Sequence, residues 1–240
     1  MGSLRRLARM LLAAAGMVCL PCLPLNVSAE EAPRKKLIAL TFDDGPSVYT
    51  GRILDALEAH GARATFFVQG DRVGKYSDEV RRAVAIGCEV AGHGWNHSEL
   101  SRLSNGDLTG HLLRTQQAIL DATGVEPPML YRAPYGSTGK RMLEISAELG
   151  FMLIDWTFLG DSTDEASKTS EIIPRRAHHG AIVLCHDIRL STAKAMQTAI
   201  PELIARGYEL VTVSELLEAA GQPVVPGAVW KGLPKPRREE

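Results

Sequence analysis

Histidine and aspartate residues stand at the ends of two apolar runs in this sequence. Residues 181–185 are followed directly by His186, and residues 37–42 are followed by Asp43 and Asp44. Histidine is suited to proton transfer near neutral pH, and a carboxylate can accept a proton or bind a metal. A histidine after a strand is more often a core or rim residue. Two strands that place charge at the same end of a sheet nevertheless predict one shared site.

Two further histidines, His93 and His97, follow a third apolar run at residues 88–91. Their spacing of four residues brings both imidazoles to one side of a helix or of a tight loop. With Asp44 they offer two nitrogens and one oxygen, a set suited to a divalent metal that keeps positions open for water and substrate. Zinc is the expected metal, and cobalt or nickel would accept the same ligands.

Asp43 and Asp44 point in different directions on an extended segment, because successive side chains alternate. One carboxylate can therefore bind the metal while the other acts as a base toward water. The sequence Asp-Asp-Gly-Pro is also typical of a simple turn. A turn alone does not account for the histidine pair, so we favour the site.

A fourth run, residues 129–131, leads into Arg132, Pro134 and Tyr135. An arginine at this place can orient a carboxylate through a bidentate pair. The Pro-Tyr-Gly turn can aim a backbone N–H at an oxygen that gains negative charge. In isolation, a surface arginine followed by a turn would be the better interpretation.

Strands separated by helices are predicted to position these residues, which makes the fold class α/β. Short apolar runs alternate with amphipathic segments at residues 37–42, 64–68, 88–91, 129–131, 151–154, 181–185 and 208–211. This order implies parallel pairing and right-handed crossovers. An open doubly wound sheet or a closed (β/α) barrel satisfies it. No GxGxxG opens the first helix, so a dinucleotide-binding sheet is not supported.

The N-terminal residues 1–29 have the order of a secretory signal peptide. Three arginines precede an apolar stretch with two prolines, which ends in Val27-Ser28-Ala29. About 16 apolar residues fall short of the roughly 20 that span a membrane, so cleavage is favoured over a retained anchor. We therefore expect a secreted, periplasmic or cell-envelope protein with no membrane span after cleavage.

The composition predicts one globular domain, at residues 30–220. The chain has 240 residues, of which 45% are hydrophobic and 23% charged, values typical of a folded protein. Residues 221–240, rich in proline and charge, are expected to form an extended tail.

The charge of the chain does not favour nucleic-acid binding. Without residues 1–29 the formal charge falls from -1 to about -4, because three arginines are lost, and no basic segment remains that would indicate nucleic-acid binding. Cys88 and Cys185 are expected to be separate buried thiols, and the oligomeric state is left open.

Four ordered motifs closely resemble those of the polysaccharide deacetylases with a NodB-homology domain, carbohydrate esterase family 4. The resemblance spans about residues 35–218, and its motifs are residues 41–45, 93–97, 132–136 and 184–187. It implies a distorted (β/α) barrel with about seven parallel strands. It also implies metal-dependent removal of N-acetyl or O-acetyl groups from a polysaccharide.

The resemblance also implies a role for each matched residue. These roles are Asp43 as general base; Asp44, His93 and His97 as metal ligands; Arg132 to hold Asp43; the Tyr135 backbone N–H to bind the oxyanion; Leu184, with Pro134 and Tyr135, to contact the substrate; and His186 as general acid. A general acid is required because a leaving amine needs a proton.

The sequence departs from the family pattern after the first histidine of the metal motif. The family usually has serine or threonine there to tie the loop, and this chain has Gly94. Asn96 or Trp95 is therefore expected to brace the loop.

A second departure concerns the motif that should supply an aspartate for the acid histidine and a tryptophan beside the acetate pocket. The matching region is residues 154–161. Asp161 is the favoured partner of His186 and Asp155 the reserve, and no flanking tryptophan can be assigned.

The expected function is hydrolysis of N-acetyl or O-acetyl groups on a glycan, such as the N-acetylglucosamine of peptidoglycan or chitin-type oligomers. One alternative within the same chemistry is a deformylase or deacetylase of a non-polymeric substrate. Others are a non-catalytic carbohydrate-binding relative and a structural zinc protein. Asp43 and His186, both present, argue against a non-catalytic protein.

Overall fold

The computed structural model describes residues 36–235, so the expected signal peptide at residues 1–29 lies outside the described part. Nine strands occur in this part: β1 (Lys36–Asp43), β2 (Thr65–Val68), β3 (Glu89–Gly92), β4 (Leu130–Tyr131), β5 (Met152–Ile154), β6 (Phe158–Leu159), β7 (Ala181–His186), β8 (Tyr208–Leu210) and β9 (Val229–Trp230). The helices are α1 (Thr50–Ala59), α2 (Gly70–Val73), α3 (Ser77–Ala85), α4 (Asn105–Thr123), α5 (Lys140–Leu149), α6 (Ala166–Arg176), α7 (Leu190–Ala205) and α8 (Val213–Ala219), with short 3-10 turns at Leu100–Arg102 and Pro134–Gly136.

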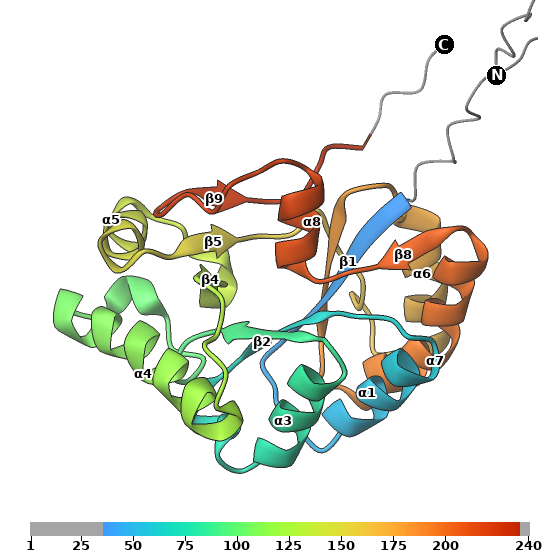
Figure 1. Ribbon diagram of the computed structural model, residues 1–240, viewed down its shortest axis with the longest axis horizontal. Coiled ribbons are helices and arrows are strands. Elements are labelled where there is room, and N and C mark those ends of the chain that lie inside the picture. The colour runs from blue at the N-terminus through green and yellow to red at the C-terminus, as the bar shows by residue number, and fades with distance from the viewer. Residues whose placement is uncertain (1–35, 236–240) are drawn as a thin grey trace, which may run out of the picture. The chain divides into compact units, whose positions relative to one another are not determined.

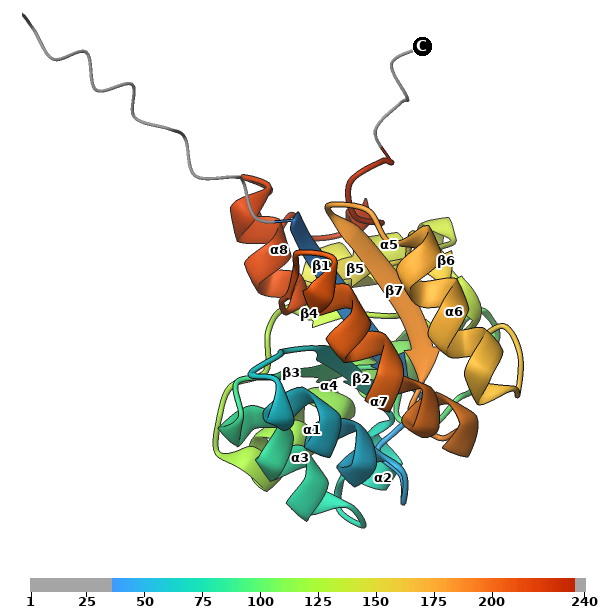
Figure 2. The same ribbon diagram turned by 90° about the vertical axis from the view of Figure 1, so that its right-hand side faces the viewer.

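One parallel sheet holds all nine strands. Its order is β6-β7-β1-β2-β3-β4-β5-β9, and β8 pairs with the first half of β1. Helices α4, α3, α1, α7 and α6 follow one another around the outside of the strands (Figures 1 and 2). This is the expected distorted (β/α) barrel.

Side chains of β1 alternate between two apolar clusters, because successive residues of a strand face opposite sides. Ile38, Leu40 and Phe42 belong to the outer cluster beneath the helices. Ala39 belongs to the inner cluster of the barrel. The buried Leu, Ile and Phe side chains contribute roughly 1.5–3 kcal/mol each to the free energy of folding. They fix which face of each strand is the inner one.

The inner face of the barrel carries the chemistry at the strand ends. Ala39, Ala91, Leu130, Ile154 and Ile182 line the inner cluster. Alternate residues of an extended segment face the same side. The residues two or four positions after these five therefore also face inward, and they are Asp43, His93, Arg132, Trp156, Leu184 and His186. The same alternation that builds the barrel core therefore aims these side chains at one end of it.

Helix α8 covers the other end of the barrel. Val213, Leu216 and Leu217 belong to the inner cluster. The helix begins at a reciprocal cap, in which Thr212 accepts from the Glu215 N–H and Glu215 accepts from the Thr212 N–H. Such a box satisfies two backbone donors that helix geometry leaves unpaired.

All seven expected strands are present, and two more, β6 and β9, were not expected. Each has two residues, which is too short for a periodicity signal. Strand β9 lies within the segment expected to be an extended tail; it pairs with β5, and Trp230 packs on the inner cluster. Cys88 and Cys185 are buried and not disulfide-bonded, as expected.

Candidate active site

The carboxyl ends of the strands surround a cleft of about 330 Å³. Most of the residues singled out from the sequence line it, namely Asp43, Asp44, His93, His97, Tyr135, Leu184 and His186, and Ala133, Gly136 and Trp156 complete the lining. Pro134, expected to contact substrate, does not line this cleft. It is buried, and a Cβ on Gly94 would lie 3.3 Å from it.

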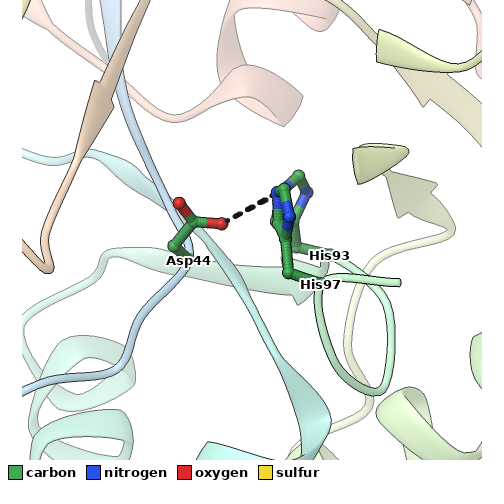
Figure 3. Close-up of side chains that lie close together, drawn as sticks. All are labelled: Asp44, His93 and His97. Atoms are coloured by element: carbon green, nitrogen blue, oxygen red, sulfur yellow. Dashed lines mark ion pairs between the residues drawn. The ribbon is translucent and has the colours of Figure 1, made fainter. Parts of the chain in front are cut away.

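Asp44, His93 and His97 form a candidate divalent-metal site. Asp44 Oδ1 lies 3.4 Å from His93 Nε2 and 3.2 Å from His97 Nε2, and the three donor atoms lie within 4.8 Å of one another. Figure 3 shows the two rings side by side, with the Asp44 carboxylate directed at them. Two imidazole nitrogens and one carboxylate oxygen are a donor set that zinc and related ions accept.

The orientation of His93 fits a metal ligand. Its Nδ1 lies 2.8 Å from the Arg132 carbonyl oxygen, which can only accept a hydrogen bond. Nδ1 therefore carries a hydrogen, and Nε2 is the nitrogen that faces Asp44 and is available to a metal ion. A second hydrogen bond of this kind typically fixes the tautomer of a ligating histidine.

Asp44 is held ionised and in a fixed place. Burial alone would raise its pKa, but the His93 hydrogen bond and the charges of three histidines lower the pKa to about 2. Its backbone lies in the left-handed region at φ 72°. Gln69, which the sequence analysis did not single out, donates from Nε2 to Asp44 Oδ1 at 3.3 Å and from its backbone N–H to the Gly45 carbonyl at 2.8 Å.

Asp43 is a buried carboxylate paired with a buried arginine. Arg132 Nη1 donates to Asp43 Oδ1 and to Thr41 Oγ1, both at 2.7 Å. Asp43 Oδ2 faces the candidate metal site, 3.8 Å from His93 Nε2. Arg132 thus holds one oxygen of Asp43 and leaves the other directed into the cleft, as a general base requires.

Arg132 is itself fixed by backbone carbonyls. Its Nε donates to Ile154 O at 3.0 Å and its Nη2 to Asp155 O at 3.1 Å, while its guanidinium lies 4.1 Å from the centroid of the Phe67 ring. A buried charge is tolerated where it is paired and hydrogen-bonded in this way. The segment after β5 therefore sets the position of the arginine.

His186 has Asp161 as its partner, which decides between the two aspartates considered from the sequence. The ring Nδ1 lies 3.0 Å from Asp161 Oδ1, and the His186 backbone N–H donates to Asp161 Oδ2 at 2.8 Å. Thr192 donates to the same carboxylate. Asp155, the reserve candidate, pairs instead with Lys231 Nζ at 2.8 Å.

The pKa of His186 is raised overall. Burial alone would lower it, but the hydrogen bond with Asp161 and the charges of Asp161, Asp43 and Asp44 outweigh burial. A raised pKa keeps the imidazole protonated at higher pH, as a proton donor requires.

Two aromatic side chains border the cleft. Tyr135 has φ 60° and an exposed ring, which stands edge-on to His97 with centroids 4.3 Å apart. Trp156, which could not be assigned from the sequence, lines the cleft, and its ring lies 3.1 Å from where a Cβ on Gly136 would stand. Trp156 lies two residues after Ile154, so both side chains face the inner side of the barrel. This alternation is the sequence signal that could have predicted the place of Trp156.

The loop after His93 is braced mainly by backbone contacts. Gly94 has φ +86°, and a Cβ there would lie 2.7 Å from the Asn96 carbonyl oxygen, which explains why serine or threonine is absent. The amides of Gly70 and Asp71 in α2 donate to the Gly94 and Trp95 carbonyls. The Trp95 ring lies between Gly70 and the Arg114 guanidinium, which stands 3.9 Å from the ring centroid. The expected brace by Trp95 is therefore seen, with α2 as its counterpart.

Asp187 is a second residue that the sequence analysis did not assign a role. Its carboxylate is fully buried against Gly45; Oδ2 accepts from Thr50 Oγ1 at 2.5 Å, and Oδ1 has no partner among the described residues. Burial raises its pKa to about 7. Ser47 donates to its backbone carbonyl, so the residue ties the end of β7 to the loop that follows β1.

A family model described as polysaccharide deacetylase matches residues 30–154. The chain belongs to this family. The peptidoglycan-N-acetylglucosamine deacetylase of Listeria monocytogenes is 39% identical over 202 residues, which cover 81% of this chain and 42% of that protein. The chain thus spans about two fifths of that relative.

Two other polysaccharide deacetylase relatives are covered almost throughout. The peptidoglycan-N-acetylglucosamine deacetylase of Bacillus cereus is 35% identical, over 80% of this chain and 92% of its own length. A family 4 acetyl xylan esterase of Clostridium thermocellum, solved with a cobalt ion, superposes with a TM-score of 0.76 at 31% identity, covering 83% of this chain and 100% of that chain.

Proposed function

We propose that this chain is a metal-dependent deacetylase that removes N-acetyl groups from a glycan, with N-acetylglucosamine of peptidoglycan as the favoured substrate. The observation that supports this proposal is that a candidate base and a candidate acid, each held by a partner side chain, lie beside one candidate metal site. Asp43 is held by Arg132, and His186 by Asp161. Two of its relatives, 39% and 35% identical, are peptidoglycan-N-acetylglucosamine deacetylases.

The side chains divide the reaction between them. Asp43 Oδ2 accepts the proton of the attacking water, and His186 donates a proton to the leaving amine. The Tyr135 N–H donates to the carbonyl oxygen as it gains negative charge, and Leu184 contacts the acetyl methyl group. A divalent ion held by Asp44, His93 and His97 supplies Lewis acidity toward carbonyl and water.

Zinc is the proposed ion. Its support is the donor set of two imidazoles and one carboxylate, which is found in catalytic zinc sites. The cobalt ion bound to the Clostridium thermocellum relative supports cobalt as a working substitute. The test is to remove the metal with a chelator and add back single ions. We expect one equivalent of zinc or cobalt to restore activity and magnesium not to restore it.

Export is proposed from the N-terminal pattern of residues 1–29. Peptidoglycan lies outside the cytoplasmic membrane, so a deacetylase acting on it needs export. Within residues 36–235 no helix is long and apolar enough to cross a membrane. The N-terminal sequence of the protein recovered from the native host tests this, with a start near Glu30 as the expected result and an intact Met1 contradicting cleavage.

Acetate release from defined glycans tests the proposed function. The zinc-loaded protein is assayed on peptidoglycan, chito-oligomers and acetylated xylan, with Asp43→Asn as the inactive partner. Asp43→Asn keeps the three ligands, so its zinc content is expected to equal that of the wild type while turnover is lost. Zinc-loaded wild type that binds these glycans without releasing acetate would instead make the protein a carbohydrate-binding relative.

A further inference from the structure

The C-terminal strap, residues 229–233, connects the two end regions of the sheet. Its strand β9 pairs with β5, and Gly232 forms an antiparallel bridge with Ala181 at the start of β7. The Leu233 N–H donates to the Gly180 carbonyl at 2.8 Å. The strap therefore joins β5, near one end of the sheet order, to β7, near the other end.

The strap holds the segment that runs from β5 to β6. The Asp155 N–H donates to the Trp230 carbonyl at 2.8 Å, and the Thr157 hydroxyl donates to the Lys231 carbonyl at 2.8 Å. Lys231 Nζ also pairs with the Asp155 carboxylate. Asp155 and Thr157, the two residues that flank Trp156, are thus both hydrogen-bonded to the strap, while Trp156 itself lines the cleft.

The same segment supplies the carbonyls that fix Arg132. Ile154 O and Asp155 O accept from the guanidinium, and the guanidinium holds Asp43 Oδ1. A continuous chain of short contacts therefore leads from the strap, through residues 154–157, to the general base. None of its members is one of the metal ligands.

We propose that the C-terminal strap is a positioning element of the catalytic site, which sets Arg132 and, through it, Asp43. The inference rests on the proposed function for its kinetic readout. Because the strap itself contacts none of the metal ligands, loosening the strap lowers kcat while metal content stays unchanged. A merely structural tail would lower the melting temperature without changing kcat of the folded protein.

Gly232→Ala is the variant of choice. Gly232 has φ +86°, and a Cβ there would lie 2.6 Å from the Gly180 carbonyl oxygen and 3.0 Å from Thr157 Oγ1, so the substitution separates the strap from both neighbours. Gly221→Ala is the matched control. That glycine also has positive φ, at +64°, but nothing lies within 4 Å of a Cβ there.

The test compares kcat, KM, zinc content and hydrogen exchange of the two full-length variants. In Gly232→Ala we expect kcat to fall about tenfold, KM and zinc content to stay near wild type, and the Asp155 amide to exchange faster. Gly221→Ala should match the wild type in all four. A wild-type kcat in Gly232→Ala, or an equal loss in Gly221→Ala, overturns the proposal.

Two further outcomes remain decisive. If Gly232→Ala fails to fold, Leu233→Ala replaces it, because that side chain packs on Gly180 and its removal adds no backbone strain. A smaller fall in kcat with unchanged zinc supports the strap, and a wild-type kcat overturns it. If the wild type itself releases no acetate, the proposed function fails. Hydrogen exchange then tests the strap by itself: faster exchange of the Asp155 amide in Gly232→Ala shows that the strap holds this segment, and unchanged exchange shows that it does not.

Discussion

His186 donates to Asp161 twice, from its backbone N–H to Oδ2 and from its ring to Oδ1. One carboxylate thus fixes both the end of strand β7 and the imidazole that the strand presents. Asp161 has no exposed surface, so water does not compete for these bonds. The pairing leaves Nε2 of His186 as the nitrogen that faces the cleft and can give up a proton.

Asp161→Asn is expected to move the alkaline limb of the rate profile to lower pH. Asp161 is the main contact that raises the pKa of His186 against the effect of burial, so its loss lowers that pKa and deprotonates the acid earlier. Below that limb the rate is expected to fall about 10²-fold, because the imidazole loses its orientation. The pH dependence of kcat/KM checks this, with the exposed Asp164→Asn as the control for charge. An unmoved limb would show that another group is the proton donor.

Gln69→Ala is expected to weaken zinc binding about tenfold. The side-chain amide donates to Asp44 Oδ1, the same atom that faces both histidines, and orients the carboxylate toward them. Competition with a zinc chelator measures the affinity. Gln197→Ala removes an exposed amide that donates to the Arg52 carbonyl and should bind zinc as the wild type does. Equal affinities in the two variants would remove Gln69 from the site.

Much of the barrel and its site could be predicted because both depend on local patterns. Each long strand is a run of apolar residues, and the candidate catalytic residues come directly after the runs, as with Asp43 after residues 37–42. The two aspartates do differ in direction, as expected, but not through strand alternation: β1 ends at Asp43, which Arg132 holds, and the left-handed backbone of Asp44 turns its carboxylate toward the histidines.

The features that could not be predicted depend on contacts between distant segments. Strand β9 has two residues and no periodicity; it is a strand because β5 offers it a free edge. Gln69 follows a strand without any motif, and its role depends on where the loop after β1 lies. Asp161 and Asp155 have similar settings in the sequence, and only the tertiary fold places the first beside His186 and the second beside Lys231.

Gly94→Ser, which restores the residue type usual in the family, is expected to weaken zinc binding and stability in this chain. The backbone at Gly94 is left-handed, which costs a residue with a Cβ about 1–2 kcal/mol, and the added atom would press on the Asn96 carbonyl between the two histidines. Gly124→Ala is the control, since it carries the same backbone strain at φ +70° with open space around the Cβ. Urea unfolding and chelator competition measure both effects. A Gly94→Ser variant that is as stable as Gly124→Ala and binds zinc like the wild type would contradict this account of the loop.

Asp187→Asn is expected to remove a pH-dependent loss of stability from the metal-free protein. The carboxyl has a pKa of about 7 in the fold, above its ordinary value of 3.8, so between these values the folded state binds more protons than the unfolded state. Stability from this group therefore falls as pH rises from about 4 to 7, by at most about 4 kcal/mol. Asparagine has the same shape and does not ionise, so the free energy of unfolding of Asp187→Asn, relative to wild type, should rise over this interval and then level off. Urea unfolding at pH 4.5, 6 and 8 measures the difference, and a constant difference at all three values would show that Asp187 is ionised in the fold throughout.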